Sequence, residues 1–160
     1  MKKLSLYIFL VLMWCNVGNA FFLTLTKCEG DDYKQWTNCF GSYTNDSGRK
    51  YTGEFGDIPG IRHGQGISIL KGTKYEGKFK NDKAVEGKLT YANGNIYIGT
   101  FNELGNFQGK GTFIFTDGSK FVGHFKNHLM DGPGTMTKSN GEVLKGIWRE
   151  GKLTEIISTN

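Results

Sequence analysis

Hydrophobic and polar residues alternate along residues 39–151 with the two-residue period of β-strands. In segment 75–79, Tyr75, Gly77 and Phe79 fall on one side of an extended chain, whereas Glu76 and Lys78 fall on the other. The central glycine leaves a space over which a neighbouring aromatic ring can lie. The pattern therefore predicts half-buried strands with one aromatic face and one largely polar or β-branched face.

This pattern recurs five times, at intervals of 22 to 24 residues, in segments 48–55, 72–79, 94–101, 118–125 and 141–148. Paired glycines such as Gly109 and Gly111 lie between the segments. The sequence resembles the MORN (membrane occupation and recognition nexus) repeat family, whose pattern is Tyr-x-Gly-x-Phe followed by Gly-x-Gly. The resemblance implies a row of β-hairpins that serves as an assembly or attachment module.

Each segment opens on a glycine, which predicts the turn of a β-hairpin. A three-residue loop centred on Gly118 pairs Phe115 with Phe121, and the same rule applies at Gly94 and Gly48. This register brings apolar residues together on one face of the sheet.

The turn at Gly72 differs because Gly66 lies one residue closer to the following segment than in the other copies. A three-residue loop centred on Gly72 buries Ile67 and Ile69, each contributing on the order of 2 kcal/mol. The alternative is a two-residue Gly72-Thr73 loop, which turns both isoleucines outward. We expect the first arrangement.

The predicted fold is all-β: an elongated single antiparallel sheet of consecutive hairpins, with ten strands over residues 39–151. Such an array needs covered ends. Residues 21–38, with Trp36, are expected to form an N-terminal cap. Residues 152–160 are expected to form a C-terminal cap or tail, with Leu153–Ser158 as a last edge strand.

Residues 1–20 have the pattern of a bacterial-type secretory signal peptide. Lys2 and Lys3 precede an apolar stretch over residues 4–14, and small residues at Gly18 and Ala20 precede a cleavage point before Phe21. The apolar stretch is shorter than the roughly 20 residues of a membrane span. A retained anchor over residues 4–25 is the alternative. We expect an exported protein, periplasmic or extracellular.

The two cysteines that follow the signal, Cys28 and Cys39, are expected to form a disulfide. Metal-binding and redox pairs are the alternatives. Eleven residues of sequence separation match no short Cys-x-x-Cys motif, and no histidine lies near either cysteine in the sequence.

The charge of the chain argues against nucleic acid as a partner. Removing Lys2 and Lys3 with the signal leaves 18 basic residues against 15 acidic ones, a net charge of +3. The basic residues form no run or stripe. An anionic membrane surface or a wall polymer remains compatible with this charge.

The sequence predicts no catalytic residues, no metal site and no cofactor. The residues His63, His124 and His128 are expected at a corner, on the outer face and in a loop. No Gly-x-Ser-x-Gly motif and no cysteine with an evident histidine base occurs. A carboxylate pair for glycoside cleavage stays open, because such pairs form in space.

The candidate binding surface is a row of rings, the aromatic stripe, formed by Tyr51, Tyr75, Tyr97 and Phe121. The rings either pack as core or leave an open groove for an extended peptide, a glycan or a second copy of the chain. Tyrosine at three of the four positions favours a groove, because its hydroxyl benefits from water or a partner.

These features predict a non-enzymatic exported scaffold that binds a protein partner or itself. A membrane-surface or lipid-binding module is the alternative, followed by an enzyme acting on cell-wall material.

Overall fold

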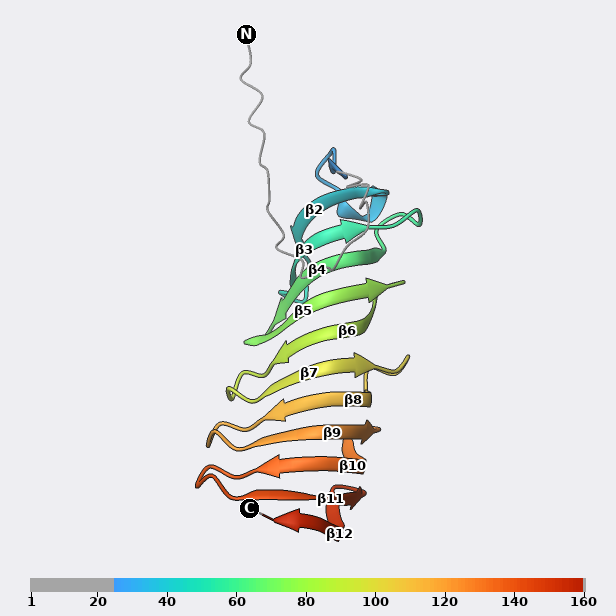
Figure 1. Cartoon of the computed structure of the whole chain (residues 1–160). Coiled ribbons are helices and arrows are strands. Elements are labelled where there is room, and N and C mark those ends of the chain that lie inside the picture. Colours follow the sequence, from blue (N-terminus) through green and yellow to red (C-terminus); the bar gives the residue numbers. More distant parts are fainter. Residues whose placement is uncertain (1–24, 160) are drawn as a thin grey trace, which may run out of the picture.

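The computed structural model describes residues 25–159, which fold into one continuous sheet with its strands in chain order (Figure 1). The predicted signal peptide and the first residues of the predicted cap lie outside the described residues. The elements are β1 (Thr26–Lys27), η1 (Tyr33–Gln35), β2 (Cys39–Thr44), β3 (Lys50–Phe55), β4 (Arg62–Leu70), β5 (Thr73–Lys80), β6 (Lys83–Thr90), β7 (Ile96–Phe101), β8 (Phe107–Ile114), β9 (Lys120–Lys126), β10 (Leu129–Thr137), β11 (Val143–Arg149) and β12 (Lys152–Thr159).

The predicted all-β fold of consecutive hairpins is confirmed. Strands β2 to β11 each pair antiparallel with the next, and β1 adds a short parallel pairing to β2. The ten strands β2 to β11 lie within residues 39–149, and β12 follows them as the last strand of the sheet. Within residues 25–159 there is no α-helix, and none of the elements there qualifies as a membrane-spanning helix.

The hairpin registers differ from the expected ones by two residues. Phe121 pairs with Phe113 rather than with Phe115. The loop consists of residues 116–118, so Gly118 is its third residue, with φ 84°, and not its centre. A three-residue hairpin loop places the left-handed residue last, and glycine adopts that conformation readily. A shift of two residues keeps every side chain on its predicted face.

At Gly72 the expected arrangement is wrong. The turn is a two-residue loop, Lys71-Gly72, in which both residues have positive φ values of 48° and 77°. Ile67 and Ile69 point outward and are 37% and 38% exposed. The alternative loop, Gly72-Thr73, gave the right direction for the isoleucines but not the right turn residues.

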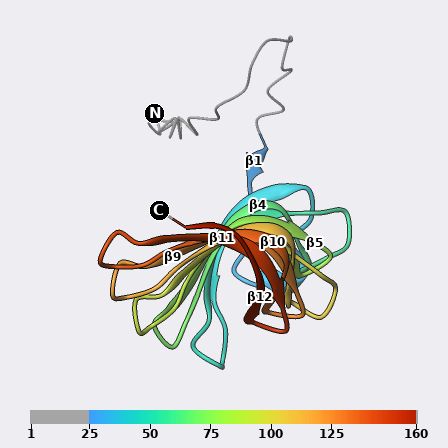
Figure 2. The same ribbon diagram turned by 60° about the horizontal axis from the view of Figure 1, so that its bottom comes forward.

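The sheet bends around its aromatic side. Figure 2 shows the strands bent near their middles, with the hairpin ends fanned out by the twist. The inner rings are buried although no second layer of described residues covers them, because the curved sheet and neighbouring rings enclose them. They form two clusters, one centred on β3 to β5 and one on β7 to β11, with Leu89 and Phe101 packed against both.

Glycines in the middle of the strands allow this packing. A Cβ atom on Gly99 would lie 2.5 Å from the hydroxyl oxygen of Tyr97. A Cβ atom on Gly66 would lie 2.6 Å from Cε2 of Tyr51. Each ring therefore lies directly over a glycine backbone, as the repeat pattern predicted.

Residues 26–39 cover the N-terminal end of the sheet. The indole of Trp36 packs edge-on against Phe55 with ring centroids 5.3 Å apart. Its Nε1 donates a hydrogen bond to the carbonyl oxygen of Glu29 at 2.9 Å. The sulfur atoms of Cys28 and Cys39 are joined in a disulfide, with Cα atoms 5.0 Å apart.

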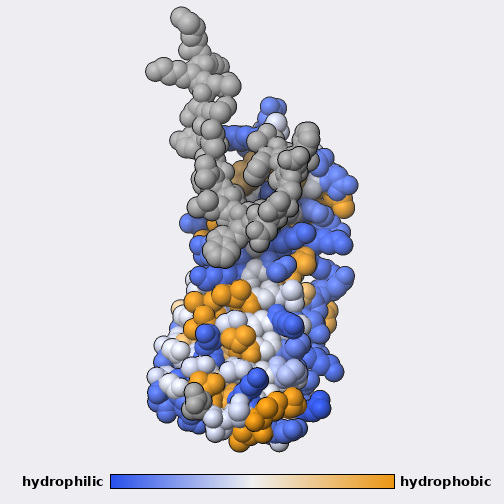
Figure 3. Space-filling model, viewed as in Figure 1, coloured by the Kyte–Doolittle hydropathy of each residue, from blue (hydrophilic) through white to orange (hydrophobic). Residues whose placement is uncertain are grey.

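The outer face carries scattered apolar residues among polar ones. Ile98 and Val122 are 44% and 46% exposed, and Thr112 lies between them on β8. On the surface visible in Figure 3, apolar side chains form separate patches rather than one continuous apolar area.

Candidate functional site

The four residues of the aromatic stripe are core residues. Tyr51, Tyr97 and Phe121 are 0% exposed, and Tyr75 is 6% exposed. Each packs edge-on against the phenylalanine four residues later in its own strand, with ring centroids 4.9 to 5.5 Å apart. A partner on this face would therefore touch the side chains around the stripe rather than these four rings.

The tyrosine hydroxyls bond to the sheet itself. Tyr51 donates to the carbonyl oxygen of Glu54 at 2.8 Å, and Tyr97 donates to that of Thr100 at 2.9 Å. Tyr75 lies 2.8 Å from the carbonyl oxygen of Lys78 and 2.9 Å from that of Glu86. The strand is bulged near these carbonyls, where the regular ladder is interrupted. Tyrosine at these positions thus satisfies backbone groups, which corrects the argument that its hydroxyl indicates an open groove.

Burial changes the ionisation of these rings. Desolvation raises the pKa of Tyr75 to about 12 and that of Tyr97 to about 12, although backbone hydrogen bonds partly oppose the rise. The pKa of Tyr51 is also raised, mainly by burial. The phenols are therefore neutral donors at physiological pH.

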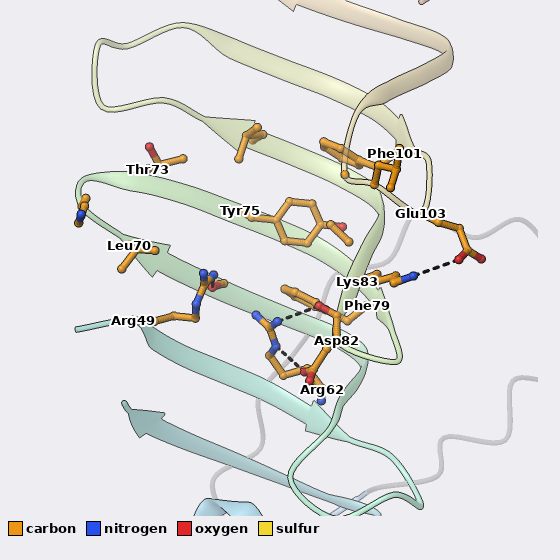
Figure 4. A pocket seen from close by; sticks show the side chains of 16 residues that line it. Arg49, Arg62, Leu70, Thr73, Tyr75, Phe79, Asp82, Lys83, Phe101 and Glu103 are labelled. Atoms are coloured by element: carbon orange, nitrogen blue, oxygen red, sulfur yellow. Dashed lines mark hydrogen bonds and ion pairs between the residues drawn. The ribbon is translucent and has the colours of Figure 1, made fainter. Parts of the chain in front are cut away.

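The aromatic face contains a hollow of about 620 Å³ over β4 to β7, which we call the β4–β7 hollow (Figure 4). Tyr75, Phe79 and Phe101 provide its aromatic walls. The hollow extends between the two ends of the strands. At one end lie Arg49, Leu70 and Thr73, and at the other end lie Arg62, Asp82, Lys83 and Glu103.

Two small residues create this hollow by departing from the repeat. Ser68 faces both Tyr51 and Tyr75 across the strands. In the other hairpins, the residue equivalent to Ser68 pairs with the first inner residue of the following core segment. These equivalent residues are larger: Tyr43, Leu89, Phe113 and Met136. Ala84 pairs with Phe79, where the later hairpins carry Phe107, Met130 and Leu153.

Arg62 occupies another inner position and is held in place by its neighbours. It pairs with Phe55 across the sheet, and its side chain is only 14% exposed. Its Nε donates to Oδ1 of Asp82 at 2.8 Å, and its Nη2 donates to the carbonyl oxygen of Asp82 at 2.7 Å. The guanidinium carbon lies 4.9 Å from the centroid of Phe79, within cation–π range. The charge of Arg62 is thus compensated within the hollow.

Arg49 is compensated far less. Its Nη1 donates to Oγ of Ser68 at 3.2 Å. Within residues 25–159, no carboxylate lies within ion-pair distance of its guanidinium, whereas Lys83 pairs with Glu103 at 3.0 Å. The β4–β7 hollow therefore combines aromatic walls with a guanidinium that retains unused donors.

The histidines form no joint site. His63 lies within β4 rather than at a corner between strands, and its Nδ1 is 3.3 Å from Oδ1 of Asn81. His124 approaches the carbonyl oxygen of Pro133, and His128 sits in a two-residue turn against Phe107. No group of three or more potential metal-ligating side chains gathers in the part of the chain that the structure describes.

Arg49, Arg62, Ser68 and Ala84 were not among the residues singled out from the sequence. They can be identified by aligning the inner positions of all hairpins in the observed registers. In that alignment Ser68 is equivalent to the larger residues Leu89, Phe113 and Met136. The register expected at Gly72 placed Ile67 and Ile69 at inner positions, so the small inner residue Ser68 could not be recognised.

Comparison with known protein families matches the MORN repeat at residues 75–96, 97–120 and 121–143. A search of curated proteins gave no match. Each matched unit begins at the inner ring of a core segment and ends at the third residue of the next segment. Residues 75–143 of this chain are thus three consecutive MORN repeats.

Proposed function

We propose that this chain is an exported, non-enzymatic scaffold that binds a protein partner along the aromatic face of its sheet. MORN repeats commonly act as protein-binding or membrane-binding modules. The observation that carries the proposal is the β4–β7 hollow, where two small inner residues leave a space bordered by the half-buried Leu89 and Phe101.

The shape of the sheet favours a protein over a membrane surface. The hollow lies on the side toward which the strands bend, where a protruding peptide can enter but a flat bilayer cannot. The net charge of +3 after removal of the signal is also too small to hold the chain on an anionic membrane by itself.

A photocrosslinking residue at two matched positions tests the location of the partner. Leu104 lines the hollow and is 85% exposed, whereas Ile98 is 44% exposed on the outer face. In an envelope extract, the probe at position 104 is expected to crosslink a partner protein that the probe at position 98 does not reach. Crosslinking only at position 98 would place the function on the outer face.

Three further measurements separate the alternatives. Light scattering of the purified protein determines whether the crosslinked partner is a second copy of the chain. Liposome flotation at several salt concentrations tests the membrane-surface module, and a wall-polymer digestion assay tests the enzyme. Export itself predicts that the intact mass of the secreted protein corresponds to a chain that begins at Phe21.

A further inference from the structure

The β4–β7 hollow contains two kinds of chemistry that point to one kind of ligand. Its walls are aromatic and aliphatic, and include Phe79, Phe101 and Leu89. The two carboxylates that line it within residues 25–159, Asp82 and Glu103, are each paired with a cation of the hollow, at 2.8 and 3.0 Å. Arg49 in the β2–β3 loop and Lys71 in the β4–β5 loop therefore leave a local excess of positive charge at this end of the hollow.

Arg49 is positioned to receive an anion. Its guanidinium is partly buried and anchored on the buried Ser68, so among the residues that the structure describes it uses one of its five donors. A planar guanidinium binds a carboxylate through two parallel hydrogen bonds. Nearby rings reduce the access of water, which strengthens such a bond relative to one at an open surface.

We propose that the β4–β7 hollow binds an extended peptide segment through an acidic side chain on Arg49 and an aromatic side chain against Phe101 and Leu89. This inference rests on the proposed function and specifies the ligand of that face. The ring of the ligand occupies the space that Ser68 and Ala84 leave, where the other repeats carry their own large side chains.

The spacing of the two anchors follows from the strands. Arg49 bonds to Ser68 on β4, and Phe101 lies on β7, three strand spacings away. Three spacings span about 14 Å, and Phe101 lies four residues along β7 from Tyr97, the residue in line with Ser68, so the backbones of the two anchors are roughly 20 Å apart along the sheet. The long side chains of the anchors and of the ligand span part of this distance, so the acidic and aromatic residues of the ligand are placed two to four residues apart.

Three synthetic peptides with acetylated and amidated ends test this specificity on the protein without its signal peptide. The first is Glu-Gly-Phe-Phe, the second replaces Glu by Gln, and the third replaces both Phe by Ser. Binding is measured by titration with fluorescence or NMR at low salt. The first peptide is expected to bind about tenfold more tightly than either of the others.

Two matched variants assign that preference to Arg49. Arg49→Gln is expected to remove the preference for Glu over Gln. Lys50→Gln removes the same charge from an exposed side chain outside the hollow and is expected to preserve the preference. Ser68→Met, which introduces the residue found at the equivalent Met136, is expected to weaken all binding at least tenfold by filling the hollow.

Several outcomes would overturn the proposal: equal affinities for the Glu and Gln peptides, no binding of any peptide, or equal effects of Arg49→Gln and Lys50→Gln. Arg49-dependent flotation with phosphatidylglycerol vesicles, in place of peptide binding, would identify a lipid headgroup instead. If the Gln peptide binds as well as the Glu peptide and Ser68→Met abolishes both, the charge specificity fails while binding on the aromatic face stands. Crosslinking confined to position 98 is the separate result that removes the proposed function itself.

Discussion

At the scale of single residues, the tyrosines of the repeat are structural because both the ring and the hydroxyl of each side chain contact the sheet. The ring fills the bend of the sheet over a glycine, and the hydroxyl donates to a carbonyl that the bulged strand leaves available. The sequence predicted the position and the face of these rings correctly. It could not show where the hydroxyls bond, because their acceptors depend on the bulges and on the curvature of the sheet.

Tyr75→Phe is expected to lower the free energy of unfolding by about 1 kcal/mol, because it removes a buried hydrogen bond to the carbonyl oxygens of Lys78 and Glu86. Tyr91→Phe is the matched control. Tyr91 is half-buried, and within residues 25–159 its hydroxyl forms no hydrogen bond. Denaturant unfolding measures both variants. Equal stabilities would contradict the structural role given to the Tyr75 hydroxyl.

The raised pKa values of Tyr75 and Tyr97 predict a loss of stability at alkaline pH. Both values are about 12, mainly through burial, compared with about 10 in an unfolded chain. The folded state holds protons that the unfolded state releases. Their contribution to stability is therefore fully present below about pH 10 and is lost as the pH rises through about 12.

Unfolding curves between about pH 8 and pH 12 measure this effect. The stability of a Tyr75→Phe/Tyr97→Phe double variant should fall less steeply above about pH 10, because two of the linked ionisations are absent. An identical decline in the double variant would mean that other groups control the alkaline transition.

At the scale of elements, turn chemistry decided which predictions were correct. The period of two fixed the faces of the strands, and those assignments survive a register error of two residues. The turn at Gly72 is different, because its two-residue loop changes the faces of Ile67 and Ile69. Aligning glycines alone could not distinguish this turn from the three-residue loops, since both contain a glycine with positive φ.

The face assignment predicts that Gly99→Val damages the fold more than Thr112→Val does, although both substitutions raise strand propensity. A Cβ atom at position 99 would lie 2.5 Å from the hydroxyl oxygen and 2.8 Å from Cζ of Tyr97. This overpacking is expected to cost about 1 to 3 kcal/mol. Thr112 lies on the outer face between Ile98 and Val122 and tolerates a branched side chain.

Thermal midpoints of the two variants provide the measurement. Thr112 is a better control than Thr100, because the hydroxyl of Thr100 donates to the carbonyl oxygen of Gln108. Similar midpoints for the Gly99 and Thr112 variants would show that the ring does not lie over the glycine.

At the scale of the whole molecule, the repeat made the architecture predictable from the sequence, but it did not allow the candidate site to be predicted. Five similar segments specify five hairpins, and one sheet follows because each hairpin pairs only with its neighbours. The β4–β7 hollow is an exception to the repeat. It became visible only when the registers aligned Ser68 and Ala84 with the large inner residues of other hairpins.

The linear arrangement also predicts that the disulfide stabilises one end of the molecule and not the other. Cys28 and Cys39 close a short loop against β2, and both belong to the cluster centred on β3 to β5. Linking them is expected to contribute roughly 2–3 kcal/mol by restricting the unfolded chain. Because each strand pairs with its immediate neighbours and its rings reach only the next strand beyond, this contribution should fade along the array.

Hydrogen exchange of the oxidised protein and of a Cys28→Ser/Cys39→Ser variant measures this decay. Amides of β2 and β3 should lose protection in the variant, while amides of β9 and β10 should exchange at unchanged rates. The second cluster, which includes Phe121 and Trp148, holds those later strands independently of the cap. If protection falls equally from β2 to β10, the sheet unfolds as one cooperative unit, and the two aromatic clusters are not separable parts of its stability.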